Sequence, residues 1–143
     1  MAEPEHDGRE ATRGRRYPLG EGGGEGVISR TGVPLGALTL DAVRAGQLRG
    51  EDFTIHPDTL RQQAGFAEEA GYPQLAANLR SAAELATLPD DRVLAIYEAL
   101  RPYRLGYEQL LALADELASE HSAPETARYV REAAEAYRRR GLA

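Results

Sequence analysis

Adjacent carboxylates such as Asp90-Asp91 and Glu68-Glu69 are side chains in this sequence that could take part in proton transfer. Carboxylates that share a proton act as a general acid and base. Neighbouring residues on a helix point about 100° apart, however, which is a poor arrangement for sharing one proton. Acids are also stabilised in the first turn of a helix. We therefore interpret Asp90-Asp91 as a helix start and Glu68-Glu69 as solvated surface.

The other residue types that carry chemistry are scarce or poorly spaced. The separations of His6, His56 and His121 match no metal motif. The sequence has no cysteine, so disulfides, thiolate nucleophiles and cysteine-bound zinc are excluded. All 17 basic residues are arginine, which excludes Schiff bases and a Walker-type phosphate loop. Residues 20–26, GEGGGEG, therefore indicate a linker. We predict no catalytic, cofactor-binding or metal-binding residue in this chain.

Composition and charge favour a chain that binds other proteins. A net charge of −6 argues against nucleic-acid binding, and the arginines at 138–140 suit the C-terminal end of a helix dipole. No run of 18 apolar residues and no apolar N-terminal stretch is present, so we expect no membrane span and no secretory signal, with the cytoplasm as the default location. Leu, Ile, Val and Phe make up only about a fifth of the 143 residues. Such a chain contains a disordered segment or completes its core on a partner.

The sequence divides into a tail and a helical domain. Residues 1–26 contain seven glycines and one large aliphatic residue, Leu19, and we predict that they form a flexible, polar, Gly-rich tail. Residues 27–143 form the predicted domain. Its first part, residues 27–38, is too apolar for a free loop and too rich in turn residues for a helix. The predicted fold is therefore all-α: a small multi-helix body with an irregular, extended N-terminal arm.

Caps, prolines and apolar spacing predict six helices in this body. They are expected to run from Thr39 to about Gly46, from Pro57 to Gly71, from Pro73 to about Ala86, from Asp90 to before Pro102, from Tyr107 to about Glu120, and from Ser122 to about Arg140. For the last helix, Ser122 and Glu125 fit a capping box, with Ser122 as the N-cap.

The segment at residues 89–104, PDDRVLAIYEALRPYR, is the densest in specific-looking side chains. Arg92, Arg101 and Arg104 surround an apolar stripe, and arginine favours fixed, bidentate pairing with carboxylates. These pairs fit salt bridges within the chain and contacts with another subunit equally well. For five tyrosines, packing in the core and contact with another subunit are both open. They are Tyr97, Tyr103, Tyr107, Tyr129 and Tyr137.

Residues 89–104 resemble the signature of the small, or gamma, subunit of adenosylcobalamin-dependent diol and glycerol dehydratases. The resemblance covers roughly residues 17–140 and keeps the family's order of motifs. The further stretches that carry it are Tyr17-Pro18-Leu19, TGVPL at 31–35, LTLDAV at 38–43, LRSAAELA at 79–86, LLALADELA at 110–118 and YVREAAEAYRRR at 129–140.

The resemblance implies a subunit of a radical enzyme, a cobalamin-dependent hydro-lyase, that is inactive by itself. In that family, propane-1,2-diol becomes propionaldehyde, or glycerol becomes 3-hydroxypropionaldehyde, with loss of water. The resemblance implies two copies each of a large, a medium and a small subunit, with adenosylcobalamin bound by the other subunits. The small subunit would stabilise the large catalytic one. Some relatives use an amphipathic N-terminal segment for encapsulation in a microcompartment, which the polar residues before Leu19 do not support.

From these observations we predict a subunit interface formed by Arg92, Tyr97, Arg101, Tyr103 and Arg104. The alternative hypothesis is a helical protein-binding adaptor unrelated to catalysis. A helix-turn-helix DNA-binding protein is a third hypothesis, which the acidity of the chain disfavours. The sequence does not distinguish diol from glycerol as the preferred substrate.

Overall fold

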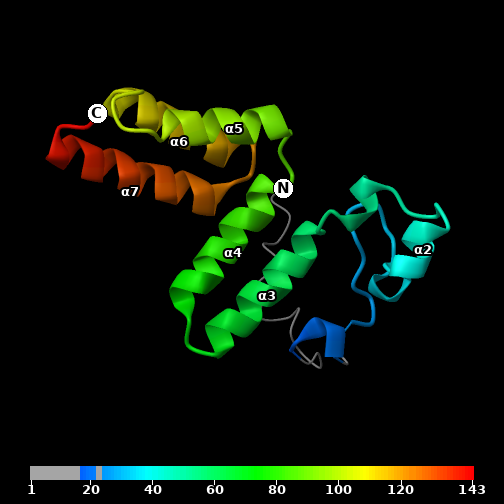
Figure 1. Ribbon diagram of the computed structural model, residues 1–143. Helices are drawn as coiled ribbons and strands as arrows, with labels where there is room; N and C mark the ends of the chain where they lie inside the picture. Colours follow the sequence, from blue (N-terminus) through cyan, green and yellow to red (C-terminus); the bar gives the residue numbers. More distant parts are fainter. Residues whose placement is uncertain (1–16, 22–23) are drawn as a thin grey trace. The chain divides into compact units, whose positions relative to one another are not determined.

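The structure is a computed structural model that describes residues 17–21 and 24–143 (Figure 1). The described residues contain six α-helices and three short 3₁₀ turns, in agreement with the all-α prediction. In chain order these are the 3₁₀ turns Leu19–Glu21 and Leu35–Ala37, α2 (Leu40–Arg44), the 3₁₀ turn Gly50–Phe53, α3 (Pro57–Glu69), α4 (Pro73–Leu85), α5 (Asp90–Ala99), α6 (Tyr107–Glu120) and α7 (Pro124–Arg140). Extended pairing within these residues is limited to two isolated bridges.

The chain divides after Ala83 into two compact units. We call residues up to Ala83 the N-terminal unit and Glu84–Ala143 the C-terminal unit. Most of the predicted tail, including His6 and part of the glycine-rich stretch, lies outside the described residues. A domain boundary at residue 26 therefore stays a prediction, although Leu19 and Val27, on either side of it, are both buried.

The irregular arm, residues 27–38, is held in place by hydroxyl and carboxylate groups. Thr31 donates its hydroxyl hydrogen bond to Asp52 Oδ1 at 2.6 Å, and the backbone N–H of Arg49 donates to Asp52 Oδ2 at 2.7 Å. Ser29 Oγ lies 3.1 Å from Thr31 Oγ1. Asp52 thus joins the arm to the 3₁₀ turn that precedes α3, which replaces the regular pairing that a sheet would provide.

Helices α2 and α3 of the N-terminal unit begin where the sequence predicted, and each has a side-chain cap. Thr39 Oγ1 accepts a hydrogen bond from the N–H of Ala42 at the start of α2. His56 Nδ1 accepts one from the N–H of Asp58 at the start of α3, at 3.1 Å, so this histidine has a structural role. Both side chains satisfy N–H groups that have no partner within their own helix.

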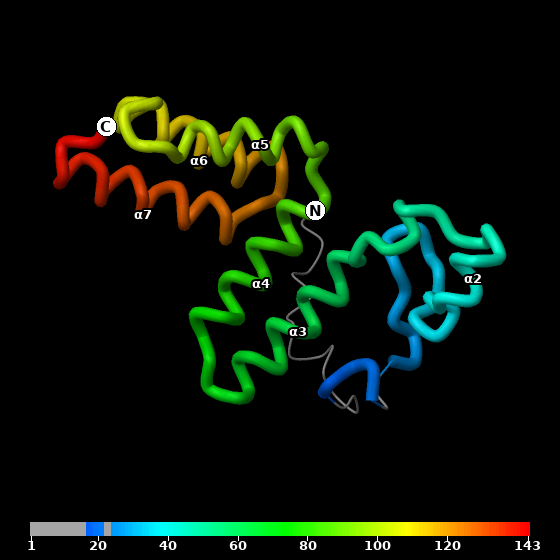
Figure 2. The backbone as a smooth tube through the Cα atoms, in the orientation of Figure 1, coloured from blue at the N-terminus to red at the C-terminus, as the bar shows by residue number. Residues whose placement is uncertain are grey.

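Helices α3 and α4 form a hairpin whose core is made of alanine. A turn at Gly71, with φ +84°, joins them (Figure 2), a left-handed conformation that favours glycine. Ala64, Ala67 and Ala76 are buried between the two helices, with Leu79 packed against them. Small side chains bring helices close together, but they bury little apolar area.

The C-terminal unit is a bundle of α5, α6 and α7 with a larger core. Its three largest fully buried side chains are Leu110 and Leu117 of α6 and Val130 of α7. From α5, Ile96 is buried in the same cluster, and Val93 and Leu100 pack against it. The α6–α7 pair is therefore covered by a third helix.

The predicted capping box at the start of α7 is wrong. Ala123, not Ser122, occupies the N-cap position, and no side chain of that residue caps the helix. Ser122 has φ +50°, and the Glu125 carboxylate pairs with Arg128 at 2.9 Å. The cap comes from Glu84, which is 41 and 42 residues away from its partners in the sequence.

The Glu84 carboxylate accepts three hydrogen bonds at the N-terminus of α7. Its Oε1 accepts from the N–H of Glu125 at 2.9 Å, and its Oε2 accepts from the N–H and the hydroxyl of Thr126 at 2.8 and 2.7 Å. Glu84 and Thr126 are both buried. A charged acceptor at the positive end of the helix dipole is more favourable than the neutral serine that the local pattern suggested.

Candidate subunit interface

Residues 89–104 form α5 and the turns that follow it, as the pattern of residues predicted. Asp90 and Asp91 are exposed in the first turn of α5 after the N-cap Pro89. They therefore stabilise a helix start, and the described residues do not place them together in a cleft. The segment is divided between the core and the surface, which decides what it can contact.

The outer face of α5 carries apolar side chains that the C-terminal unit does not cover. Leu94 and Tyr97 are separated by one helical turn and are 67% and 60% exposed. Ile96 points to another side of the same helix and is only 3% exposed. Aromatic and aliphatic side chains side by side on a helix surface are typical of a contact with another protein.

Tyr103 is the most exposed large side chain of the segment, at 76%. Its backbone has φ +63°, a conformation that is strained for any residue with a side chain. The Tyr103 N–H donates a hydrogen bond to the carbonyl of Leu142 at 2.8 Å, which fixes this conformation. Strained backbone that presents an exposed aromatic side chain is consistent with a binding role.

The three arginines of the predicted interface already have partners within the chain. Arg92 pairs with Glu116. Arg101 Nη1 and Arg104 Nε lie 3.1 and 2.9 Å from the two carboxylate oxygens of Glu98. The hydrogen bond from Arg101 lowers the pKa of Glu98, and the charge of Arg104 acts in the same direction.

These pairs bear out the alternative of salt bridges within the chain, but they do not exclude contacts with a partner. Each guanidinium has five N–H donors, so one carboxylate does not saturate it. Arg101 and Arg104 are also more than half exposed, at 63% and 54% of their side-chain surface. The interface formed by Arg92, Tyr97, Arg101, Tyr103 and Arg104 therefore stays a prediction.

The five tyrosines divide between the two alternatives. Tyr107 donates its hydroxyl hydrogen bond to Glu135, and this bond raises the pKa of Tyr107. Tyr137 donates to the carbonyl of Leu100 at 2.6 Å. Both rings pack against the core of the C-terminal unit. Tyr97, Tyr103 and Tyr129, by contrast, are each at least 59% exposed.

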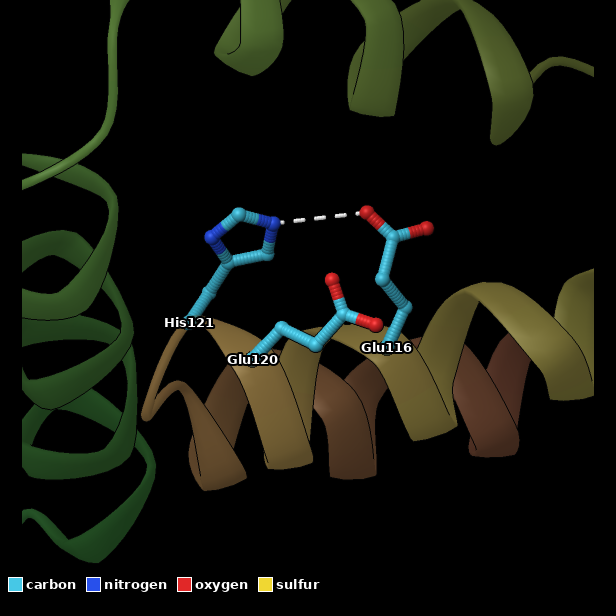
Figure 3. A group of neighbouring side chains, drawn as sticks. All are labelled: Glu116, Glu120 and His121. Atoms are coloured by element: carbon cyan, nitrogen blue, oxygen red, sulfur yellow. Dashed lines mark hydrogen bonds and ion pairs between the residues drawn. The ribbon is translucent and has the colours of Figure 1, made fainter.

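A group of three potential metal ligands lies at the end of α6 (Figure 3). Glu116, Glu120 and His121 bring one ligand atom each to within 4.8 Å of one another. Their spacing matches none of the motifs sought in the sequence. Glu116 Oε1 already accepts a hydrogen bond from Arg92 and lies 3.3 Å from His121 Nε2. Because the guanidinium places a positive charge beside this oxygen, we assign no metal to the group.

Comparison with known proteins identifies the family. The model of the family described as dehydratase small subunit matches residues 12–143. The chain belongs to the dehydratase small-subunit family. The propanediol dehydratase small subunit of Salmonella typhimurium strain LT2 is 46% identical over 121 residues, which cover 85% of this chain and 70% of that protein. The protein of the same name from Citrobacter freundii is 45% identical with the same coverage.

Membership of the dehydratase small-subunit family confirms the resemblance inferred from residues 89–104 and the flanking motifs. The shifted pKa values in the structure have local structural causes. The four groups whose pKa departs from its usual value among the described residues are Asp52, Glu98, Tyr107 and Arg128. In each case hydrogen bonds to nearby groups are the main cause.

No helix in the described part of this family member has the length and apolarity needed to cross a membrane.

Sequence reasoning missed an apolar surface on the N-terminal unit of this dehydratase small subunit. Leu75 lies within the helix predicted from Pro73 to about Ala86, and it is 51% exposed. Tyr17 and Tyr72 are each 62% exposed, and Tyr17 contacts Phe66 with ring centroids 5.6 Å apart. The sequence did contain a signal for this surface. Helices α3 and α4 are rich in alanine, and their core of alanine does not include Leu75.

Proposed function

We propose that this chain is the small, non-catalytic subunit of an adenosylcobalamin-dependent propanediol dehydratase in the cytoplasm. The enzyme would convert propane-1,2-diol to propionaldehyde and water and would contain two copies each of a large, a medium and a small subunit. The observation that carries the proposal is the 46% identity to a propanediol dehydratase small subunit over 70% of its length. Both relatives named above carry propanediol in their names, which favours this diol over glycerol.

The two cavities described in the N-terminal unit support a cobalamin site on another subunit. Cavities of about 430 and 650 Å³ in the N-terminal unit have mainly apolar walls, whereas the amide side chains of a corrinoid require polar partners. His56 caps α3, and His121 faces Glu116. We therefore place adenosylcobalamin on the other subunits, where the cofactor would carry the radical chemistry.

The role left for this chain is to stabilise the large subunit by binding to its folded form. A partner that binds only the folded state stabilises it in proportion to its concentration and affinity. The outer face of α5 and the turn after it supply exposed aromatic groups at Tyr97 and Tyr103, with Arg101 and Arg104 beside them. Aromatic residues and arginine are the side chains that contribute most to protein interfaces.

The test of the function is co-expression of this chain with the large and medium dehydratase subunits encoded in the same genome. We expect the three chains to co-purify with a native mass of two copies of each, and to form aldehyde only when adenosylcobalamin is added. Propane-1,2-diol and glycerol are assayed in parallel. Full, stable activity from the two larger chains alone, with this chain eluting as a monomer, would reject the proposal in favour of an unrelated adaptor.

The test of the α5 surface is the double substitution Arg101→Ala and Tyr103→Ala. We expect co-purification with the large subunit to weaken by about tenfold or more, because these residues would lie in the contact. The matched control is Arg44→Ala with Leu40→Ala, since both side chains are also exposed but lie on α2, outside residues 89–104. Equal recovery of the large subunit by both double variants would reject the assignment of this surface.

A further inference from the structure

A groove runs along the α3–α4 hairpin of the N-terminal unit. Its volume is about 650 Å³, and every residue that lines it belongs to the N-terminal unit. The lining side chains are Tyr17, Gln63, Phe66, Ala67, Glu69, Ala70, Tyr72, Leu75 and Leu79. Apart from Gln63 and Glu69, these side chains are apolar or aromatic, so the groove lacks the several convergent polar groups that orient a small-molecule ligand.

The lining residues repeat at helical spacing on both walls. Phe66 and Ala70 lie one turn apart on the α3 side, and Leu75 and Leu79 lie one turn apart on α4. Residues three and four apart share one face of a helix. The groove is therefore a continuous apolar channel between two antiparallel helices, which is the shape that receives a third helix.

The C-terminal unit shows how such a channel is filled. There, α5 covers the α6–α7 pair with Ile96 buried and with Val93 and Leu100 packed against the same core. In the α3–α4 groove, by contrast, no third helix contributes a residue to the lining. Instead, Tyr17 covers part of Phe66, and Leu75 is left half exposed.

We propose that the α3–α4 groove binds an amphipathic helix of another dehydratase subunit, which completes a three-helix bundle. This inference rests on the proposed function, because the partner is a subunit of the same enzyme. The helix would present apolar side chains at positions i, i+3 or i+4, and i+7. The chain would then have two separate docking surfaces, this groove on the N-terminal unit and the α5 face on the C-terminal unit.

Two other occupants are disfavoured by observations on this chain. Residues 1–16, MAEPEHDGREATRGRR, contain no Leu, Ile, Val, Phe or Tyr and cannot supply an apolar stripe. A second copy packed symmetrically would place the same concave surface on both sides of the contact, which leaves the channel unfilled. A convex helix from a different chain fills it.

The test compares two matched substitutions in the co-expressed three-chain complex. Leu75→Glu places a charge in the groove, and Leu40→Glu makes the same change on α2 at a residue that is 74% exposed and does not line the groove. Both side chains are at least half exposed, so neither change is expected to unfold the chain, which circular dichroism checks. We expect Leu75→Glu to weaken assembly about tenfold or more and Leu40→Glu to leave it unchanged.

A crosslinking experiment identifies the occupant with the chain otherwise intact. The photoreactive residue p-benzoylphenylalanine is placed at Leu75 in the assembled complex, and the crosslinked peptides are mapped by mass spectrometry. Crosslinks to the apolar face of a helix in another subunit would support the inference. Crosslinks to a second copy or to other residues of this chain would overturn it, as would normal assembly of Leu75→Glu. Failure of the wild-type chain to assemble would instead reject the proposed function on which the inference rests.

Discussion

The two units of this chain have the same helical class but different kinds of core. In the C-terminal unit, leucine, isoleucine and valine from three helices are buried together. In the N-terminal unit, the buried cluster between α3 and α4 consists of alanine, and large apolar side chains such as Leu75 and Phe53 are about half exposed. Burial of large side chains contributes most of the stabilisation of a folded domain. We therefore expect the C-terminal unit to be close to self-sufficient, whereas the N-terminal unit resembles half of an interface.

This difference explains why a chain with so few large aliphatic residues is still a specific structure. About a fifth of the sequence is Leu, Ile, Val or Phe, and the three largest fully buried side chains all lie after Ala83. The sparse core suggested by the composition is thus a property of one unit rather than of the whole chain. A subunit can leave one unit incomplete if the partner supplies the missing apolar surface.

The largest difference between the two units is expected when one leucine is truncated in each. We expect Leu117→Ala to lower the free energy of unfolding of the isolated chain by about 3 kcal/mol, because Leu117 is fully buried and its removal leaves a cavity. We expect Leu75→Ala to lower it by less than about 0.5 kcal/mol, because Leu75 is half exposed. Urea denaturation followed by circular dichroism measures both changes.

In the assembled enzyme we expect the order of the two effects to be reversed, with Leu75→Ala having the larger effect on subunit binding. Leu75→Ala would weaken binding to the other subunits, whereas Leu117→Ala would reduce the amount of folded chain without altering the affinity of what remains folded. Titration of the large subunit with each variant separates affinity from folded fraction. Equal destabilisation of the isolated chain by the two substitutions would contradict the distinction between a self-sufficient and an incomplete unit.

The next largest effect is expected at Glu84, where the C-terminal unit depends on one charged cap. Glu84→Ala removes three hydrogen bonds and leaves the N–H groups of Glu125 and Thr126 without their acceptor. Hydrogen bonds to charged groups contribute about 1.5–3 kcal/mol each in favourable cases, but losses within one network do not add. We expect a loss of about 2–3 kcal/mol in the urea unfolding of the isolated chain.

The control for this change is Glu132→Ala, which removes an exposed carboxylate of α7 that pairs only with Arg128 in the described contacts. An exposed pair of this kind contributes at most about 1 kcal/mol. If Glu84→Ala and Glu132→Ala destabilised the chain to the same extent, the cap would not be a main support of the C-terminal unit.

Glu84 also shows where prediction from the sequence stops. The starts of α2, after the N-cap Thr39, and of α3, at Pro57, were predicted correctly because the capping side chain and the N–H group that donates to it lie within three residues of each other. The start of α7 was assigned to Ser122 on the same local logic, which failed because the acceptor lies about 40 residues upstream. Local patterns contain no information about which distant side chain reaches a helix end.

The same limit applies to the candidate interface. The sequence located the segment at residues 89–104, but it could not separate the buried Ile96 from the exposed Tyr97, because this depends on which side of α5 faces the bundle. It also left open whether the arginines pair within the chain. The groove on α3 and α4 was missed because a partly filled stripe of alanine and leucine reads like the face of any core helix.

The smallest effect is expected from acid, and it concerns the arm of the N-terminal unit. The backbone N–H of Arg49 and the hydroxyl of Thr31 donate to Asp52 and hold its pKa below the usual value. A group whose pKa is lower in the folded state stabilises the fold above its unfolded pKa, near 4, and that contribution is lost as the pH falls through the lower, folded value. Stability should therefore decline on acidification from pH 4 downwards.

Asp52→Asn is expected to remove this part of the acid dependence, because an amide does not titrate. Amide hydrogen exchange of residues 27–38, measured at several pH values and corrected for the intrinsic rate, reports on the arm directly. In the wild-type chain, protection of the arm should fall below pH 4 while protection of α6 and α7 is retained to lower pH. In the variant, the arm should lose its pH dependence in this range. If the arm and the C-terminal helices lost protection together in both proteins, the two units would unfold as one, and the contrast between a sufficient and an incomplete core would fail.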